Sequence, residues 1–339
     1  MSDELAVPAY IRRGDQLALR HRFKRLQRRD EVGQAAALAR VGHHIHQRIV
    51  PLDLAVRHAA GEVDSLCSRA SRGLRAQRRF HRPAANQQQP GIGDAFDQCG
   101  HGCDKIVDPL VSSDIAGIGI GVPSVVNIEK GIVYDVIHIP SWKEVHLGSI
   151  LHERYGLPIH VNNDANCFAL GELYFGKGKG QRDFIGLTIG TGLGAGIIIN
   201  RRLYAGPHCG AGEFGMVDYL DHCYEYYACG QFFRNVHGVD GEEVFKKASQ
   251  GDAHARALYA EMGMHLGKAI RMVLYTYDPS LIIFGGSVRH AYAWFQEAMW
   301  AEIRKFAFGT SGMDLKIELS GLENSGILGA AALYYDSMK

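Results

Sequence analysis

A glycine-rich segment between two runs of β-branched residues constrains the fold of this chain more than any other feature. Phe184–Ile189 and residues 195–199 each predict a buried strand, and glycines stand at 190, 192 and 194 between them. A dinucleotide-binding fingerprint must open a helix, whereas these glycines lead into a second strand. A Walker A loop is excluded as well, because no Gly-Lys-Ser/Thr follows. The segment therefore predicts a β-hairpin, either a plain tight turn or one whose backbone amides hold an anion.

Strands and helices both recur from about residue 113 to the end of the chain. β-branched runs predict further strands over 115–122, 159–161, 281–284 and 315–319. Apolar periodicity predicts helices over 144–155, 166–175, 252–277, 292–306 and 326–335. Because hairpin-like and helix-linked strands occur together, we predict a mixed-sheet α/β architecture.

Two acidic positions and a glycine pair lie in segments suited to a ligand. Residues 162–166 read Asn-Asn-Asp-Ala-Asn between a predicted strand and a predicted helix. The Asp164 carboxylate can accept a hydroxyl proton there, although a plain Asx cap on the helix explains the same pattern. Glu213 stands among glycines, and Gly285-Gly286 follows a buried strand, where backbone can approach a nucleotide closely. Taken alone, each of these segments also fits a loop that binds nothing.

The net charge of +1 hides two segments of opposite sign. Residues 1–113 hold 16 Arg and 2 Lys against 12 acidic residues, a net charge of +6, whereas residues 114–339 carry −5. Of the 15 Tyr, only Tyr10 lies in the first segment. The 7 cysteines are irregularly spaced, no apolar run is long enough to span a membrane, and the first residues lead us to expect no secretory signal. We therefore expect a cytoplasmic protein with no membrane partner, whose two segments need separate explanations.

Five segments lie in order between about Asp114 and the C-terminus: IAGIGIGVP at 115–123, VNNDANCFALGE at 161–172, LTIGTGLGAGIIIN at 187–200, LYAGPHCGAGEFG at 203–215 and LIIFGGSV at 281–288. In this order they resemble the ROK family of repressors, open reading frames and kinases. The resemblance implies an α/β, actin-like (ribonuclease H-like), two-domain sugar kinase fold. It also implies a sugar as the small-molecule partner, with ATP and Mg²⁺ used to phosphorylate a hexose or N-acetylhexosamine. Homodimers are common in the family, but the sequence leaves the oligomeric state and the identity of the sugar open.

The resemblance further implies a role for each matching residue. Asp164 would be the general base that takes the proton from the attacking sugar hydroxyl. Asn163, Glu213 and His138 would hydrogen-bond the sugar, His138 from a His-Ile-Pro-Ser-Trp segment where family kinases often have Asn-x-Pro-Gly-Trp. The ATP-binding residues would be Gly190, Thr191 and Gly192 at the hairpin turn, and Gly285 and Gly286 beside the nucleoside. One positioned carboxylate suffices because alignment and charge stabilisation dominate phosphoryl transfer.

The loop after Glu213 departs from the family pattern. Many family members carry a zinc site there, but Met216 stands at its histidine position, and only Cys229-Gly230 remains of its cysteine pattern. A thioether is a poor substitute for imidazole on Zn²⁺, so we expect no structural zinc. Aromatic packing is expected to shape the loop instead, with His222, Cys223 and Cys229 regrouped around a metal as the alternative.

The N-terminal third departs further. Family kinases begin with a strand and an Asp-x-Gly-Gly-Thr turn that holds the ATP phosphates, and residues 1–113 contain no Asp-x-Gly-x-Thr. Three explanations compete: a foreign or frame-shifted segment, a divergent half-domain with another phosphate clamp, and a DNA-binding arm. The predicted domains are 1–113 as an atypical basic segment, 114–140 with 325–339 as the remainder of a small domain, and 141–324 as the large sugar and nucleotide domain.

The missing turn also sets the functional prediction. We expect a sugar kinase of the ROK family whose activity is weak or absent in this chain. The alternatives are a sugar-responsive transcriptional regulator and an inactive sugar-binding remnant. A nucleic-acid partner is not expected, because no clear helix-turn-helix pattern accompanies the basic charge.

Overall fold

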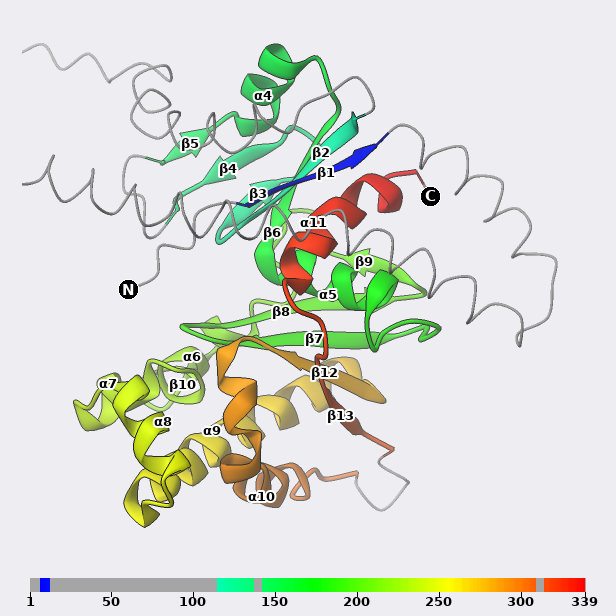
Figure 1. Ribbon diagram of the computed structural model, residues 1–339. Coiled ribbons are helices and arrows are strands. Elements are labelled where there is room, and N and C mark those ends of the chain that lie inside the picture. Colours follow the sequence, from blue (N-terminus) through cyan, green and yellow to red (C-terminus); the bar gives the residue numbers. More distant parts are fainter. Residues whose placement is uncertain (1–6, 13–114, 137–141, 309–313, 339) are drawn as a thin grey trace, which may run out of the picture.

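The computed structural model describes residues 7–12, 115–136, 142–308 and 314–338, and of residues 7–12 only the backbone. His138 and nearly all of the basic N-terminal segment lie outside the described residues. The described part of the chain forms two main sheets with helices between them and beyond the second sheet (Figure 1).

The first sheet has the strand order β1 (Val7–Arg12), β2 (Ile115–Val122) and β6 (Ile159–Asn163). β6 runs parallel to β2, and β1 runs antiparallel to it. A small antiparallel sheet of β3 (Val125–Asn127), β4 (Ile132–Tyr134) and β5 (Glu144–Val145) follows β2 along the chain. From there α4 (Leu147–Tyr155) leads into β6, and Gly156 in the left-handed conformation ends that helix.

The second sheet has five strands in the order β13 (Lys316–Leu319), β12 (Leu281–Gly285), β7 (Phe184–Ile189), β8 (Leu193–Ile199) and β9 (Arg202–Tyr204). β13, β12 and β7 are parallel to one another, whereas β8 and β9 are antiparallel to their neighbours. The carboxyl ends of β7 and β12 therefore lie at the same edge of the sheet. This is the edge at which α/β sheets commonly bind their ligands.

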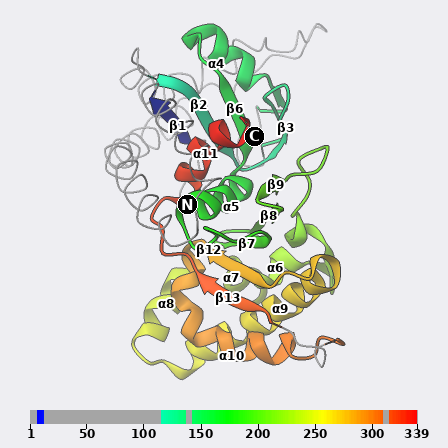
Figure 2. The ribbon, with the colours of Figure 1, turned by 90° about the vertical axis from the view of Figure 1, so that its right-hand side faces the viewer.

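Two helices fill the space between the main sheets (Figures 1 and 2). α5 (Asp164–Phe175) packs on β7 and β8, and α11 (Ser325–Asp336) packs on both α5 and β2. On the far side of the five-stranded sheet lie α9 (Ala253–Tyr277) and α10 (Tyr292–Ile303), preceded by the 3-10 turn η3 (Ser287–Ala291). The apolar stripe of α9, with Met262, Leu266 and Ile270 fully buried, explains why this long helix forms here.

The connection from β9 to α9 consists of short elements. They are the 3-10 turn η2 (Phe214–Met216), the hairpin β10 (Asp218–Tyr219) and β11 (His222–Cys223), and the helices α6 (Tyr224–Ala228), α7 (Phe232–His237) and α8 (Gly241–Ser249). Asp240 caps α8 by accepting hydrogen bonds from two backbone N–H groups of its first turn. This connection carries several of the residues discussed below.

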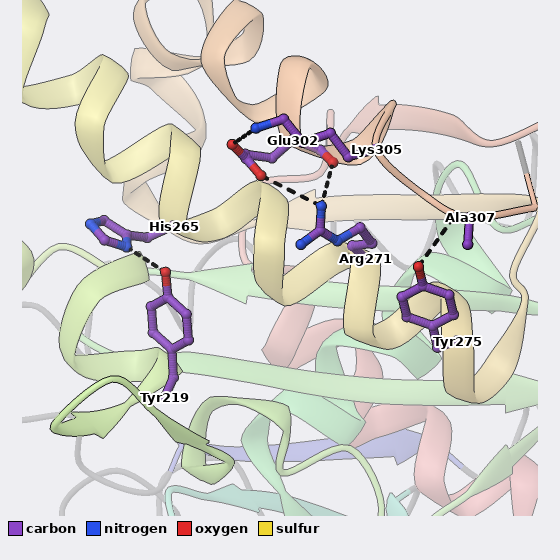
Figure 3. A network of polar contacts seen from close by, with 7 residues as sticks. All are labelled: Tyr219, His265, Arg271, Tyr275, Glu302, Lys305 and Ala307. Atoms are coloured by element: carbon purple, nitrogen blue, oxygen red, sulfur yellow. Dashed lines mark hydrogen bonds and ion pairs between the residues drawn. The ribbon is translucent and has the colours of Figure 1, made fainter.

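A polar network fastens this connection and α10 to α9 (Figure 3). The Tyr219 hydroxyl lies 3.0 Å from Nδ1 of His265, which places the hairpin on α9. The carboxylate of Glu302, buried on α10, pairs with Arg271 of α9 at 3.6 Å and accepts a hydrogen bond from Lys305. The helices behind the second sheet are thus held by polar contacts as well as by the core.

The strands and helices expected from about residue 115 onward are present, but residues 144–145, expected to begin a helix, form β5, and the helix expected over 292–306 ends at Ile303. Ile115–Val122 and Phe184–Ile189 have the predicted bounds, and the helix expected over 166–175 begins two residues earlier at Asp164. β1 was not predicted, and neither were α6 to α8. β6 pairs with β2 although the predicted domain boundary at 140 separates them, and the division into domains stays a prediction. Among the described residues no helix has the length and apolar character that a membrane crossing requires.

Candidate functional site

Asp164 is the first residue of α5, directly after β6. Asn163 caps the helix: its side-chain oxygen accepts hydrogen bonds from the N–H groups of Ala165 at 2.9 Å and Asn166 at 3.3 Å. Its side-chain nitrogen donates to the carbonyl of Ser124 at 3.4 Å. The cap predicted for this segment is therefore Asn163, and the exposed Asp164 carboxylate stands in the first helical turn. The helix dipole favours the ionised carboxylate at that position.

Buried amides beneath Asp164 hold the start of α5 in place. The side-chain oxygen of Asn162 accepts hydrogen bonds from the Asn163 N–H at 2.8 Å and the Asn166 amide at 2.9 Å. The thiol of Cys209 also lies 3.5 Å from this oxygen, which ties the loop after β9 to the same point. Asn162 and Asn166 are almost fully buried. Of the three asparagines in this segment, two thus support the structure beneath the site.

Glu213 ends the loop between β9 and η2, which lies against β8. A Cβ on the preceding Gly212 would come within 2.3 Å of the Ala195 carbonyl oxygen, so only glycine allows this close approach. Partial desolvation and, secondarily, the nearby Glu225 carboxylate raise the pKa of Glu213, although the residue is exposed to solvent. Two carboxylates therefore share this part of the molecule.

Glu225 was not singled out from the sequence. It lies in the first turn of α6, and its carboxylate accepts a hydrogen bond from the N–H of Leu193 at 2.8 Å, at the start of β8. It stands in an aromatic run with no ligand-binding motif, so no local pattern pointed to it. Only the folded arrangement brings Glu225 to the glycine-rich turn.

The hairpin turn between β7 and β8 is shaped by contacts to its carbonyl groups. The Gly190 carbonyl accepts a hydrogen bond from the Gly230 N–H at 2.7 Å, and the Thr191 carbonyl accepts one from the Cys229 thiol at 2.9 Å. The Gly190 N–H donates to the Gly192 carbonyl at 3.0 Å. Within the described part of the chain, the N–H groups of Thr191 and Gly192 have no acceptor. Neighbouring backbone donors can bind an anion where they converge, and the Glu225 carboxylate lies on the other side of the turn's last glycine, 2.5 Å from where a Cβ on Gly192 would be.

The glycine pair at the end of β12 lies beside this turn. Gly285 pairs with Thr188, so the strand ends of β12 and β7 meet. Gly286 has φ of +76°, and a Cβ there would lie 2.2 Å from the Ile189 carbonyl oxygen. Both features require glycine. The two segments expected to bind ATP are thus brought together by the parallel pairing.

β8 connects the acidic residues to the turn. α5 packs on β8 so closely that a Cβ on Gly194 would lie 3.0 Å from the Cβ of Ala165, the residue after Asp164. Glu213 lies beside the same strand, because the preceding Gly212 packs against the Ala195 carbonyl of β8. Asp164, Glu213 and the turn at Gly190 therefore all border the first half of β8, whereas His138 lies outside the described residues.

The loop that replaces the zinc-binding pattern does not present a set of metal ligands. Met216 is 60% exposed. Cys229 is fully buried, with its thiol engaged by Thr191 and Gln231, and His222 stacks on Tyr226 with ring centroids 3.9 Å apart. Among the described residues, no group of three or more His, Cys, Asp or Glu side chains could hold a metal ion. These residues do not fit a zinc site, and the absence of zinc from the protein stays a prediction.

Comparisons with known proteins agree with the arrangement of these segments. The ROK family model matches residues 71–337, so the similarity begins before Asp114, where the recognisable motifs start. The glucokinase of Streptomyces coelicolor is 32% identical over 226 residues, which are 55% of this chain and 71% of that protein. The xylose repressor of Caldicellulosiruptor bescii is 28% identical over 260 residues, 68% of this chain and 65% of that protein, slightly less than two thirds of its length.

A solved structure gives the same result for the fold. The ROK family glucokinase of Streptomyces griseus, in complex with glucose and AMPPNP, matches with a TM-score of 0.59 and 27% identity over 72% of this chain and 88% of that chain. The predicted α/β, actin-like fold is confirmed by this likeness. The chain belongs to the ROK family.

Proposed function

We propose that this protein is an ATP-dependent sugar kinase that phosphorylates a hexose or N-acetylhexosamine. The observation that carries the proposal is that two features lie along the same strand, β8: the Asp164 carboxylate at the start of α5, and the hairpin turn whose Thr191 and Gly192 N–H groups have no acceptor among the described residues. The likeness to glucokinases, one of them bound to glucose and AMPPNP, supports the choice of sugar and ATP as substrates.

In the proposed reaction, a sugar hydroxyl attacks the γ-phosphorus of ATP, the bond to the β,γ-bridging oxygen breaks so that ADP leaves, and Asp164 accepts the hydroxyl proton. Asn163 and Glu213, with His138, orient the sugar by hydrogen bonds to other hydroxyls. The N–H groups of Thr191 and Gly192 donate to phosphate oxygens, where they stabilise the charge of the transferred group. Gly285 and Gly286 contribute backbone beside the nucleoside, since the positions of their Cβ atoms are occupied by the Phe168 ring and the Ile189 carbonyl. Mg²⁺ enters as the MgATP complex, because this ion is held largely by substrate phosphates and water in such sites.

The rate should be low compared with that of a kinase that has two phosphate-binding turns. The Asp-x-Gly-x-Thr turn is missing from the sequence of residues 1–113. One turn then has to align the phosphates, and a loss of alignment lowers the rate steeply. Sugar-dependent release of ADP tests the proposal, and glucose binding without any turnover would leave an inactive sugar-binding remnant instead.

A regulator is the second candidate, because a xylose repressor is among the relatives. The net charge of +6 on residues 1–113 would suit DNA binding, in which case affinity for an operator would fall steeply with salt. A full chain that shows no affinity for DNA at low salt would exclude this candidate.

The cytoplasmic location and the homodimer stay predictions. Cell fractionation tests the location, and light scattering tests the oligomeric state.

Gly190→Ala is expected to abolish most nucleotide binding without harming the fold. A Cβ on Gly190 has no other protein atom within 4 Å, so the substituted chain should unfold at the same temperature as the wild type. In the proposed site that space receives a phosphate, which the methyl group would displace. Titration calorimetry with MgATP and a thermal melt separate the two effects. A variant that binds MgATP as tightly as the wild type would argue against phosphate binding at this turn.

The affinity for sugar should fall in mild acid because of the raised pKa of Glu213. The ionised carboxylate accepts hydrogen bonds from sugar hydroxyls, and it gains a proton at a higher pH than an ordinary glutamate because of burial and the charge of Glu225. Glu225→Gln removes the second cause, so the loss of affinity should move to lower pH. Glucose titrations of both proteins across the acidic range measure the shift. An unchanged profile would show that Glu225 does not act on Glu213.

A further inference from the structure

We propose that Cys229 and Gly230 position the hairpin turn at Gly190 so that the N–H groups of Thr191 and Gly192 point toward the phosphates. This inference rests on the proposed function of the turn. Cys229 and Gly230 are positioning residues in it, since their contacts are to the turn. They join α6 to α7, far along the chain from β7 and β8.

The contacts form a two-point clamp on consecutive carbonyl groups. Gly230 donates its N–H to the Gly190 carbonyl at 2.7 Å, and Cys229 donates its thiol hydrogen to the Thr191 carbonyl at 2.9 Å. The sulfur in turn accepts a hydrogen bond from the Gln231 N–H at 3.4 Å, which fixes the side chain. Both carbonyl groups are thus engaged, whereas the N–H groups of Thr191 and Gly192 have no acceptor among the described residues and remain available as donors.

The protonation state of the thiol suits this role. Cys229 is fully buried, and burial raises its pKa to about 12. The groups facing it include the carboxylate of Glu225 on α6, which favours the protonated thiol further, whereas the N–H groups of Gln231 and Phe232 favour the thiolate less strongly than burial opposes it. The S–H donor is therefore present at neutral pH. A buried thiol of this kind has little reactivity of its own.

Gly230 allows no larger residue at this contact. A Cβ there would lie 2.6 Å from the Gly190 carbonyl oxygen and 3.5 Å from a methyl group of Val288. The obstructing atom belongs to the backbone and cannot turn aside as a side chain can. A methyl group on Gly230 should therefore push the turn out of place. The turn and the α6–α7 junction thus fit each other at backbone distance.

α6 holds the other end of the turn as well. Glu225 accepts the Leu193 N–H at 2.8 Å, one helical turn before Cys229 engages Thr191. Glu225, in the first turn of α6, therefore contacts the first residue of β8, and Cys229, directly after the helix, contacts the turn itself. The shape of the phosphate turn depends on this short helix rather than on the hairpin alone.

The test compares Cys229→Ala, Cys229→Ser and Gly230→Ala with the wild type. The full chains are titrated with Mg-AMPPNP and, separately, with glucose, and their melting temperatures are recorded. Loss of one hydrogen bond should weaken Mg-AMPPNP binding by about 2-fold to 10-fold in Cys229→Ala. Cys229→Ser keeps a donor and should restore binding. Gly230→Ala should lose more affinity than Cys229→Ala, and glucose binding should stay unchanged in all three.

The matched control is Gly321→Ala, where a Cβ has no atom within 4 Å, and it should bind both ligands as the wild type does. Equal Mg-AMPPNP affinity in all variants would overturn the positioning role of Cys229 and Gly230 but not the proposed kinase function. A parallel loss of glucose binding and thermal stability in Cys229→Ala that Cys229→Ser does not restore would also overturn it, because the thiol would then be only a packing group. A wild-type chain that binds glucose but no Mg-AMPPNP would overturn the proposed kinase function itself.

Discussion

Asp164→Asn is expected to lower sugar phosphorylation by about 10²-fold to 10⁴-fold, the range that a positioned general base contributes. The substitution keeps an oxygen that can accept the Ala165 N–H, as the carboxylate does at 2.8 Å, so the start of α5 should not change. What it removes is the negative charge and the ability to take a proton from the sugar hydroxyl. The affinity for sugar should change little, because Asn163 and Glu213 supply the proposed hydrogen bonds. Coupled measurement of ADP release, together with glucose titration, separates the two quantities.

Asp183→Asn is the matched control for this prediction. Asp183 is an exposed carboxylate before β7, at the other end of the strand from the turn, where it accepts the Asn200 N–H. The control should phosphorylate sugar at the wild-type rate. If Asp164→Asn retained most of the activity, Asp164 would not be the base and the proposed chemistry would be wrong.

Gly329→Leu is expected to destabilise the fold by at least about 3 kcal/mol, near the upper end of the cost of overpacking. α11 crosses α5 so closely that even a Cβ on Gly329 would lie 1.5 Å from the Cys167 carbonyl oxygen and 2.8 Å from the Gly171 nitrogen. Because the atoms in the way are helix backbone, the two helices must move apart. That movement would disturb α5, which carries Asp164, so activity should fall with stability. Denaturant unfolding at fixed pH measures the loss.

The control on the same helix is Gly326→Ala. A Cβ there has no neighbouring atom within 4 Å, and alanine favours helix over glycine by up to about 1 kcal/mol. This variant should be as stable as the wild type or slightly more stable. A Gly329→Leu chain that unfolded at the wild-type denaturant concentration would mean that α5 and α11 do not cross at this distance.

Local sequence patterns predicted much of the fold. The β-branched runs on either side of Gly190 fixed both strands of the hairpin, and the apolar stripe of 252–277 predicted α9 to within one residue. A buried strand was correctly expected before Gly286, although it extends one residue further than predicted and includes Gly285. These elements are predictable because their periodicity reflects burial on one face or on both, which is a local property of the chain.

The contacts between distant segments were not predictable in the same way. Glu225 and Cys229 stand in a run of aromatic residues, and their relation to the turn depends on where α6 packs, more than 30 residues along the chain from Leu193. β1 was missed because Val7–Arg12 contains a proline and lies next to further arginines, which weakens the strand pattern. Its pairing with β2 is a tertiary contact that propensity does not encode.

Some of the site residues lie where the motifs predicted, and one of them, Asn163, also has a structural use that the motifs did not predict. Asn163 was expected to touch the sugar, but its side-chain oxygen caps α5 and its side-chain nitrogen donates to the Ser124 carbonyl. The second hydrogen of that nitrogen is the donor it can offer to a sugar hydroxyl. Asp164 and Glu213 were expected from motifs, and both border β8. The roles assigned to them stay proposals that the substitutions above test.

The most direct measurement is the detection of a sugar phosphate after the full chain is incubated with MgATP and a panel containing glucose, mannose, N-acetylglucosamine and N-acetylmannosamine. Mass spectrometry of the sugars and quantification of ADP follow the two products of one transfer. We expect one sugar to gain a phosphate, slowly, with one ADP formed for each sugar phosphate, and no product from Asp164→Asn. Tight binding of a sugar with neither product, in a chain whose melting temperature rises with that sugar, would contradict the proposed kinase function.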